Sequence, residues 1–127
     1  MSPPTAAILG ASADHQKFGN KSLRAHRHAG YEVFPVNPRG GTIEGLEVFT
    51  SILEVPGDAP LDRVSIYLPP PLCLQALPDI AKRGAHEVWL NPGTSSPEIL
   101  ELGEQLGLTL INACSIVDLG LSPADFP

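Results

Sequence analysis

The residues best suited to bind an anion lie at positions 10–19, directly after the first apolar run of the chain. Small residues such as Gly10 and Ala13 let the backbone approach a phosphate closely, and free amides at the start of a helix favour negative charge. Ser12 adds a hydroxyl donor and Lys17 adds a cation. This segment is a candidate phosphate-binding loop. The alternative is a glycine-rich turn that only serves the geometry of the chain.

The surrounding sequence narrows the type of nucleotide. Ser12 replaces the middle glycine of the G-x-G-x-x-G pattern, and no Asp or Glu ends the second apolar run to bind a ribose 2′-hydroxyl, so NAD is disfavoured. That run is followed by Asn37, Pro38 and Arg39. An arginine here suits a ribose with an extra phosphate, as in NADP or coenzyme A (CoA). The alternative is a solvated arginine in a turn.

The histidines do not form a metal site in this pattern. His26 and His28 lie two apart on an expected helix and so point in different directions, which does not fit a metal-binding pair. We expect both at the surface, where they would add to a positive patch. His15 lies in the first loop, within reach of a ligand, and His86 should be exposed just before a strand.

The sequence also lacks a recognisable nucleophile. There is no G-x-S-x-G motif, and Ser12 has no identifiable base partner. Cys73 and Cys114 form no CxxC pattern, so both are expected to be reduced. For Cys114, which follows the last expected strand, a buried and inert thiol is favoured over one beside a ligand cleft. We therefore assign no catalytic residue and no metal ligand.

Alternating strand and helix patterns must position these residues. Five short apolar runs predict strands, at residues 5–9, 32–36, 63–68, 87–90 and 109–112. Helices are predicted at about 20–29 and where apolar residues recur at helical spacing, around 73–80 and 99–106. Such alternation implies an α/β fold with a doubly wound, mainly parallel five-stranded sheet and helices on both faces. Ligands bind such sheets at the carboxyl ends of the strands, where the strand order reverses.

Prolines and glycines mark the departures from this pattern. Residues 37–62 are rich in both and predict loops with one short helix near residues 50–53. Pro35 removes a hydrogen-bond donor from the second strand, which should be irregular or lie at a sheet edge. Pro78 should kink its helix or split it in two. The last stretch, 115–127, shows no clear element.

Two further loops should lie on the same side as Gly10. Pro69 begins a run of three prolines, which is expected to end a strand and start a helix rather than to bind a partner. Pro69 could also form a rigid apolar rim beside an adenine. The loop after Leu90 leads to a third helix, with Ser95 or Ser96 as its N-cap.

Length and composition restrict the class of protein. The chain has 127 residues, of which 43% are hydrophobic. This is enough for one domain with its own core, and no apolar run reaches the roughly 18 residues of a membrane span. Since the start also lacks a signal-peptide pattern, we expect a soluble cytoplasmic protein. Its single domain should span residues 1–127, with a core at about 5–114 and a tail at 115–127.

Charge is distributed unevenly along the chain. The formal net charge is −6, which disfavours nucleic acid as a partner. Residues 1–43, however, carry five Lys/Arg and two Asp/Glu, a net charge of +3, whereas the remainder carries −9. We expect the positive third, which contains the first loop, to meet a compact anionic ligand.

The motifs occur in a characteristic order. The chain contains in succession Ala7–Ser12, Phe18–Gly19, Gly30–Pro38, Gly45 and Val88–Gly93. This series, which extends from about Thr5 to Cys114, resembles the small stand-alone CoA-binding proteins. Those proteins are similar to the N-terminal domain of the succinyl-CoA synthetase alpha subunit.

The resemblance implies a Rossmann-like domain that binds CoA through its ADP portion. By this match, the diphosphate is held by Gly10, Ser12, Ala13 and Asp14. Arg39 corresponds, with a one-residue gap, to a lysine after the second strand of the synthetase domain. A further contacting segment is formed by Leu90, Asn91 and Pro92. The full set of candidate cofactor-binding residues adds Lys17, Gly19, Asn37, Pro38 and Pro69.

Two positions depart from the stand-alone members. Asn91–Gly93 stands where a glutamine-x-glycine turn is usual, and Ala113 stands where an arginine precedes the cysteine. The contacts of that rim are therefore less well defined by the match than those of the first loop. The synthetase's catalytic histidine belongs to a second domain outside the matched region, so ligase activity is not implied.

Three functions follow from these observations. The leading hypothesis is a protein that binds CoA or acyl-CoA without catalysis, as a carrier, sensor or partner module. The enzyme alternative is a small NADP-binding oxidoreductase, which the same loop and Arg39 would permit. The third is an interaction module with a vestigial nucleotide site. The sequence leaves the oligomeric state and any protein partner open.

Overall fold

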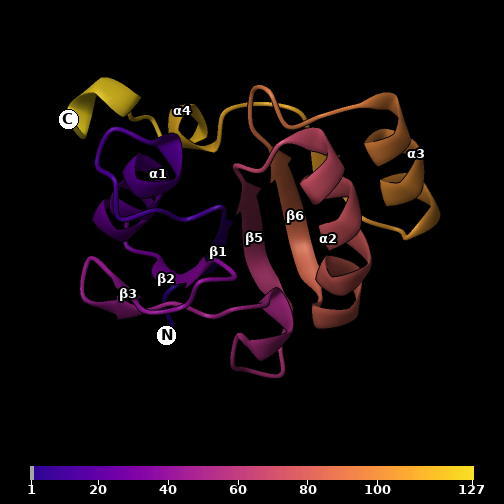
Figure 1. Ribbon diagram of the computed structural model, residues 1–127, viewed down its shortest axis with the longest axis horizontal. Helices are drawn as coiled ribbons and strands as arrows, with labels where there is room; N and C mark the ends of the chain where they lie inside the picture. Colours follow the sequence, from indigo (N-terminus) through magenta and orange to yellow (C-terminus); the bar gives the residue numbers. More distant parts are fainter. Residues whose placement is uncertain (1) are drawn as a thin grey trace.

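The main sheet has five parallel strands. The computed structural model describes residues 2–127 and gives the strand order β2-β1-β5-β6-β7 (Figure 1). A short antiparallel hairpin, β3–β4, follows β2. The strands are β1 (Thr5–Leu9), β2 (Glu32–Val36), β3 (Thr42–Ile43), β4 (Leu46–Glu47), β5 (Leu61–Ile66), β6 (Ala85–Leu90) and β7 (Leu110–Ile111). The helices are α1 (Phe18–His28), α2 (Pro70–Arg83), α3 (Pro97–Gln105) and α4 (Ser115–Asp118), with 3-10 turns η1 (Ile52–Glu54) and η2 (Pro123–Asp125).

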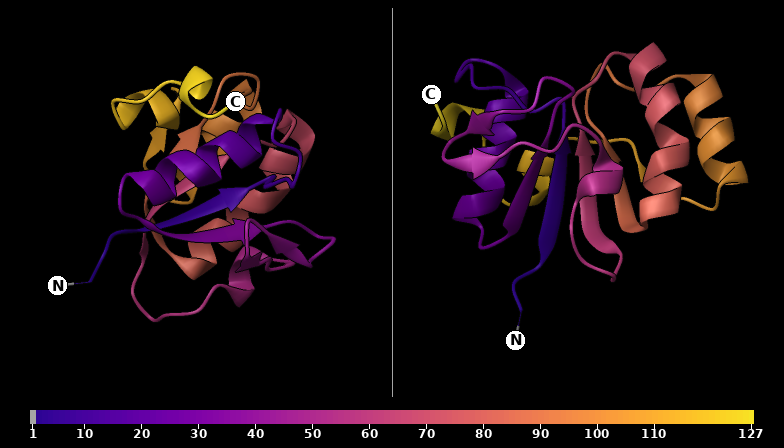
Figure 2. Two further views of the ribbon diagram at one scale, coloured as in Figure 1. Left: turned by 90° about the vertical axis from the view of Figure 1, so that its left-hand side faces the viewer. Right: turned by 60° about the horizontal axis from the view of Figure 1, so that its bottom comes forward.

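Helices cover both faces of the sheet, which confirms the doubly wound α/β fold (Figure 2). On one face, Leu77 and Ile80 of α2 and Ile99 of α3 belong to the larger apolar core. On the other face, Leu23 of α1 packs with Ile8 of β1 in a smaller apolar cluster. None of the helices within residues 2–127 is long and apolar enough to cross a membrane.

The second strand lies at an edge of the sheet, as its proline predicts. Pro35 lies level with Ile8 of β1, but its own backbone groups face the outer edge of the sheet, so its missing N–H costs no hydrogen bond to β1. On the outer side, the carbonyl of Pro35 accepts a hydrogen bond of 2.9 Å from the amide of Phe49. The edge is therefore partly covered by the chain that leads from the hairpin to η1.

The helix α2 runs without a break through Pro78, so the predicted split is wrong. Pro78 is exposed, so its ring lies on the solvent side of the helix. Because proline has no N–H, the carbonyl four residues earlier lacks its helical donor, and water can bind that carbonyl instead. At the start of α3, Ser96 rather than Ser95 is the N-cap, and its hydroxyl accepts from the amide of Ile99 at 3.3 Å. Pro97 occupies the first turn.

The C-terminal segment is structured, contrary to the expectation of no clear element. It forms α4 and η2, which lie beside α1 (Figure 1). The guanidinium of Arg24 donates to the carbonyls of Phe126 and Pro127, at 2.9 and 3.2 Å. These partners are about a hundred residues apart in sequence, so local periodicity could not reveal them.

Candidate functional site

The strand order reverses between β1 and β5, and this point is the centre of the candidate site. The chain leaves β1 toward α1 on one face and leaves β5 toward α2 on the other. Crevices for ligands open at such points in α/β sheets. Gly10, after β1, and Leu68, after β5, line two cavities that meet there.

Two glycines allow the first loop to lie very close to the backbone at Tyr67 and to the start of α1. Gly10 has φ +82°, and a Cβ there would lie 2.5 Å from the carbonyl oxygen of Tyr67. Gly19, in the first turn of α1, packs so closely that a Cβ would lie 2.2 Å from the carbonyl oxygen of Gly10. Both contacts are with backbone, which cannot move aside cheaply. Glycine is therefore required at both positions for α1 to begin directly against the loop.

Side chains on either side fix the conformation of the loop. The amide of Asn20 donates to the carbonyl of Ser12, and the amide of Asn37 donates to that of Ala11, both at 2.9 Å. Within the loop, the Ser12 hydroxyl accepts from the amide of Asp14 at 3.1 Å, which leaves the hydroxyl proton available to a ligand. The side chain of Asn37 thus helps to hold the loop in place.

The loop presents free amides beside the start of α1. The amides of Gly10 and Ala11 are already used, because both donate to the carbonyl of Val36. Those of Ser12, Ala13 and Phe18 have no hydrogen-bond partner among residues 2–127. Donors of this kind, together with the positive end of the helix dipole, favour an anion.

The first cavity, called here the loop cavity, has a volume of about 460 Å³. Its walls come from three loops at the carboxyl ends of the strands. They are formed by Gly10, Gln16, Lys17, Phe18 and Gly19 of the first loop, Tyr67, Leu68 and Pro69 after β5, and Pro92, Gly93 and Thr94 after β6. The loops after Leu9, Ile66 and Leu90 therefore lie on one side of the sheet, as expected.

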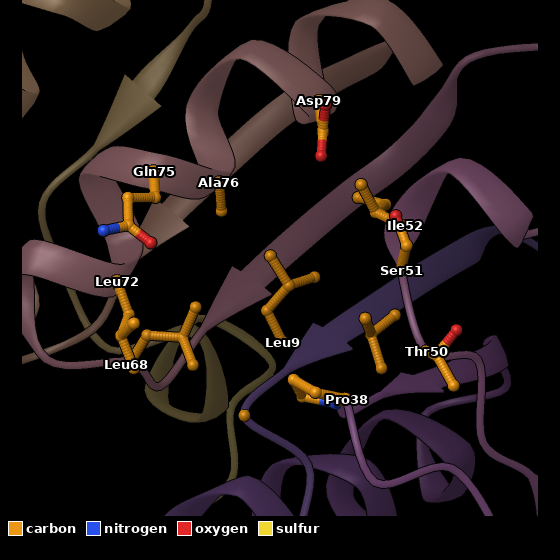
Figure 3. A pocket seen from close by; sticks show the side chains of 12 residues that line it. Leu9, Pro38, Thr50, Ser51, Ile52, Leu68, Leu72, Gln75, Ala76 and Asp79 are labelled. Carbon is orange, nitrogen blue, oxygen red and sulfur yellow. The ribbon is translucent and has the colours of Figure 1, made fainter.

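The second cavity, called here the slot, lies between α2 and the segment from β2 to η1 and has a volume of about 310 Å³ (Figure 3). Its floor is apolar, with Leu9, Val36 and Ile52. Pro38 and Leu68 lie at the end of the slot opposite Asp79.

Several predicted site residues line the cavities and others do not. Pro38 lines the slot, whereas Arg39 beside it is exposed, with its backbone amide bound to the Asn37 side chain at 2.9 Å. Leu90 and Asn91 are buried, so their side chains lie in the core rather than in a cavity. Only Pro92 of that predicted segment lines the loop cavity.

Asn91 instead connects β5, β6 and α4 below the cavity. Its side-chain amide donates to the hydroxyl of Ser65 at 2.9 Å and the carbonyl of Ile66 at 3.0 Å, and its carbonyl accepts from the amide of Ser115 at 2.9 Å. The Ser115 hydroxyl in turn lies 3.1 Å from that of Tyr67, which lines the loop cavity. Burial raises the pKa of Tyr67, so this hydroxyl stays protonated at neutral pH.

The β3–β4 hairpin supports the loop through Glu44, which the sequence did not single out. Its carboxylate lies 2.9 Å from Nε2 of His15 and accepts from the Asn20 amide at 3.3 Å. The Asn20 hydrogen bond and the contact with His15 lower the pKa of Glu44. His15 therefore contacts the hairpin.

The expectation that His26 is exposed is wrong. Its ring is completely buried between α1 and the sheet, and Nδ1 donates to the carbonyl of Ser22 at 2.8 Å. Burial is the main reason that its pKa falls to about 4, and the nearby Arg63 guanidinium lowers it further. His28 is exposed, as is His86.

The positive charge of residues 1–43 is also less concentrated at the site than expected. Arg24 binds the C-terminal segment, and Arg27 donates to the carbonyl of Glu44 at 2.9 Å. Lys17 lines the loop cavity, and Arg39 lies beside the slot. Among residues 2–127 no group of three potential metal ligands is present. Cys73 is buried and Cys114 is half-buried.

The buried His26 leads to a pH-dependent stability. The unfolded chain binds a proton at this histidine near pH 6.5, whereas the folded chain does so only near pH 4, so stability falls as the pH falls between these values. We expect the wild type to lose about 2 kcal/mol more than His26→Gln between pH 7 and pH 5. Urea unfolding at both values measures this. Both proteins keep the other titratable and charged groups, including Glu44, Arg63 and Asp118, so these groups affect both equally. An equal loss of stability in His26→Gln would therefore contradict the prediction.

A family model described as a CoA binding domain matches residues 4–120. The chain belongs to this CoA-binding domain family. It is 32% identical over 111 residues to the alpha subunit of ADP-forming acetate–CoA ligase I from Pyrococcus furiosus, which covers 83% of this chain and 23% of that subunit. The chain therefore spans about a quarter of the length of this relative.

Relatives nearer its own length are also found. The protein YneT of Bacillus subtilis is 27% identical over 109 residues, which cover 83% of this chain and 76% of YneT. A solved structure of a conserved hypothetical protein from P. furiosus has a TM-score of 0.81 and 33% identity, over 91% of this chain and 98% of the other. Chains of similar size therefore resemble this one in sequence, and the P. furiosus structure shares its α/β fold.

Proposed function

We propose that this CoA-binding domain binds CoA or acyl-CoA through the ADP portion, at the carboxyl ends of β1 and β5. The observation that carries the proposal is the meeting of two cavities at Gly10. The apolar slot suits the adenine, which is flat, and the loop with its free amides suits the diphosphate. The loop cavity then receives the pantetheine arm, with its thiol end toward solvent or a partner.

Polar side chains supply the remaining contacts in this arrangement. The Ser12 hydroxyl donates to the diphosphate and Lys17 adds a positive charge beside it. Arg39, at the exposed end of the slot, binds the 3′-phosphate of the ribose.

We further propose a role as a carrier, sensor or partner module. No serine, cysteine or lysine side chain that lines the cavities within residues 2–127 is hydrogen-bonded to a histidine or carboxylate. The Thr50 hydroxyl donates to Glu54, but that carboxylate also accepts from the amides of Thr50 and Ser51 and serves as the cap of η1.

Calorimetric titration of the folded protein with CoA tests the proposal, with NADP as the comparison ligand. We expect saturable binding of CoA and weaker binding of NADP, because NADP carries its extra phosphate on the 2′ oxygen rather than the 3′ oxygen. The absence of heat at millimolar CoA, with folding confirmed by circular dichroism, would overturn it. Tighter binding of NADP would indicate the oxidoreductase hypothesis instead.

Arg39 gives a specific prediction within this proposal. Arg39→Glu should weaken CoA binding about tenfold or more, because an arginine–phosphate pair is replaced by repulsion. Dephospho-CoA lacks the 3′-phosphate, so its affinity should be nearly unchanged. Lys82→Glu makes the same charge reversal at an exposed site in the last turn of α2 and serves as the control. Equal losses for CoA and dephospho-CoA would assign Arg39 a different role.

A further inference from the structure

One side chain of the slot has no structural role of its own. Asp79 lies on the third turn of α2, and its carboxylate points into the slot (Figure 3). Among residues 2–127 it has no hydrogen-bond or ion-pair partner. On the opposite wall, the Thr50 hydroxyl donates to Glu54, whereas the Ser51 hydroxyl accepts from the amide of Leu53 and keeps its proton available.

The position of Asp79 restricts what the slot can hold. The walls around it are apolar, with Ile52 on one side and Ala76 on the same helix. An aliphatic acyl chain would desolvate the carboxylate without offering it a donor, which is unfavourable. A flat group with an N–H donor at its edge would bury its faces against the apolar walls and satisfy the carboxylate at its edge.

We propose that Asp79 selects adenine by accepting a hydrogen bond from its 6-amino group. This inference rests on the proposed CoA binding and assigns the base specificity of that site. An ionised carboxylate only accepts hydrogen bonds, so a 6-keto oxygen in the place of the amino group sets two acceptors against each other, and the N1–H of such a purine lies one ring atom away from that position. Gln75, one helical turn earlier, carries both a donor and an acceptor and so does not discriminate between the two bases.

The test uses CoA and its hypoxanthine analogue, in which a keto oxygen replaces the 6-amino group. The wild type should bind CoA at least about tenfold more tightly than the analogue. Asp79→Asn presents a donor as well as an acceptor, so the ratio should fall to within about threefold, mainly through tighter binding of the analogue. Calorimetry measures both affinities for each protein.

Glu101→Gln, at an exposed position on α3, removes the same charge away from the slot and should keep the wild-type ratio. An unchanged ratio in Asp79→Asn, or a wild type that binds both ligands equally, would overturn the role of Asp79 while CoA binding itself stands. A wild type that binds neither ligand would overturn the proposed function, and the inference with it.

Discussion

Replacement of Gly19 by alanine is expected to lower the free energy of unfolding by about 1–3 kcal/mol and to weaken CoA binding at least about tenfold. In an exposed helix, alanine would stabilise relative to glycine by about 1 kcal/mol. Here the new Cβ would lie 2.2 Å from the carbonyl oxygen of Gly10, so α1 and the loop must separate. That separation changes both the loop amides and the wall of the loop cavity. Urea unfolding and calorimetry measure the two effects.

Gly103→Ala is the matched control for this substitution. Gly103 also lies in a helix and is buried, and its Cβ would meet Leu110 at 2.3 Å, but the contact is with a side chain that can rotate away. We expect a smaller loss of stability than for Gly19→Ala and no change in CoA affinity. If Gly19→Ala bound CoA like the wild type, the close approach of α1 to Gly10 would not be needed for the site.

The regular part of the fold could be predicted because its signals are local. Short apolar runs give β1 and β2 with the observed boundaries, and they give β6 to within two residues. Gly30, Gly84 and Gly107 end helical stretches and have positive φ, as expected for residues past a helix end. The position of the first loop followed from the same local signals, because a parallel sheet places the strand ends on one side.

Contacts between distant segments could not be predicted in this way. His26 carries no mark of burial in its own segment, since its burial depends on Tyr31, on Arg63 of β5 and on the C-terminal α4. Arg63 is itself buried, and it binds Asp118 at 2.9 Å and lies over the ring of Trp89. The polar layer under α1 therefore forms only once the chain has folded.

Parts of the candidate site also depend on contacts between distant segments and could not be predicted. Asp79 lies in an ordinary amphipathic helix, and nothing in its neighbours along the chain indicates a cavity. Its place in the slot depends on residues 36–52, which approach from the other side. Asn91 was predicted to contact the cofactor, but its side chain is buried and does not line either cavity. Its neighbours in the fold show that it holds the strands together beneath the loop cavity.

Asn91→Asp is expected to destabilise the protein by about 3 kcal/mol at neutral pH. The two side chains have the same shape, so packing is preserved. Aspartate, however, offers acceptors only, and it would direct an oxygen at the carbonyl of Ile66, which now receives a hydrogen bond of 3.0 Å from Asn91. The charge would also be buried, because Asn91 is only 1% exposed and its hydrogen-bond partners within residues 2–127 are uncharged.

The pH dependence of this variant separates the hydrogen-bond effect from general damage. Burial and the facing carbonyl raise the pKa of the new carboxyl above its unfolded value, so the folded state binds the extra proton more readily. Once protonated, the carboxyl can again donate to Ile66, and the deficit relative to wild type should shrink as the pH falls toward 5. Asn112→Asp makes the same change at an exposed residue and should alter the free energy of unfolding by less than about 0.5 kcal/mol. A deficit in Asn91→Asp that stayed constant with pH would show that burial of the charge is not its cause.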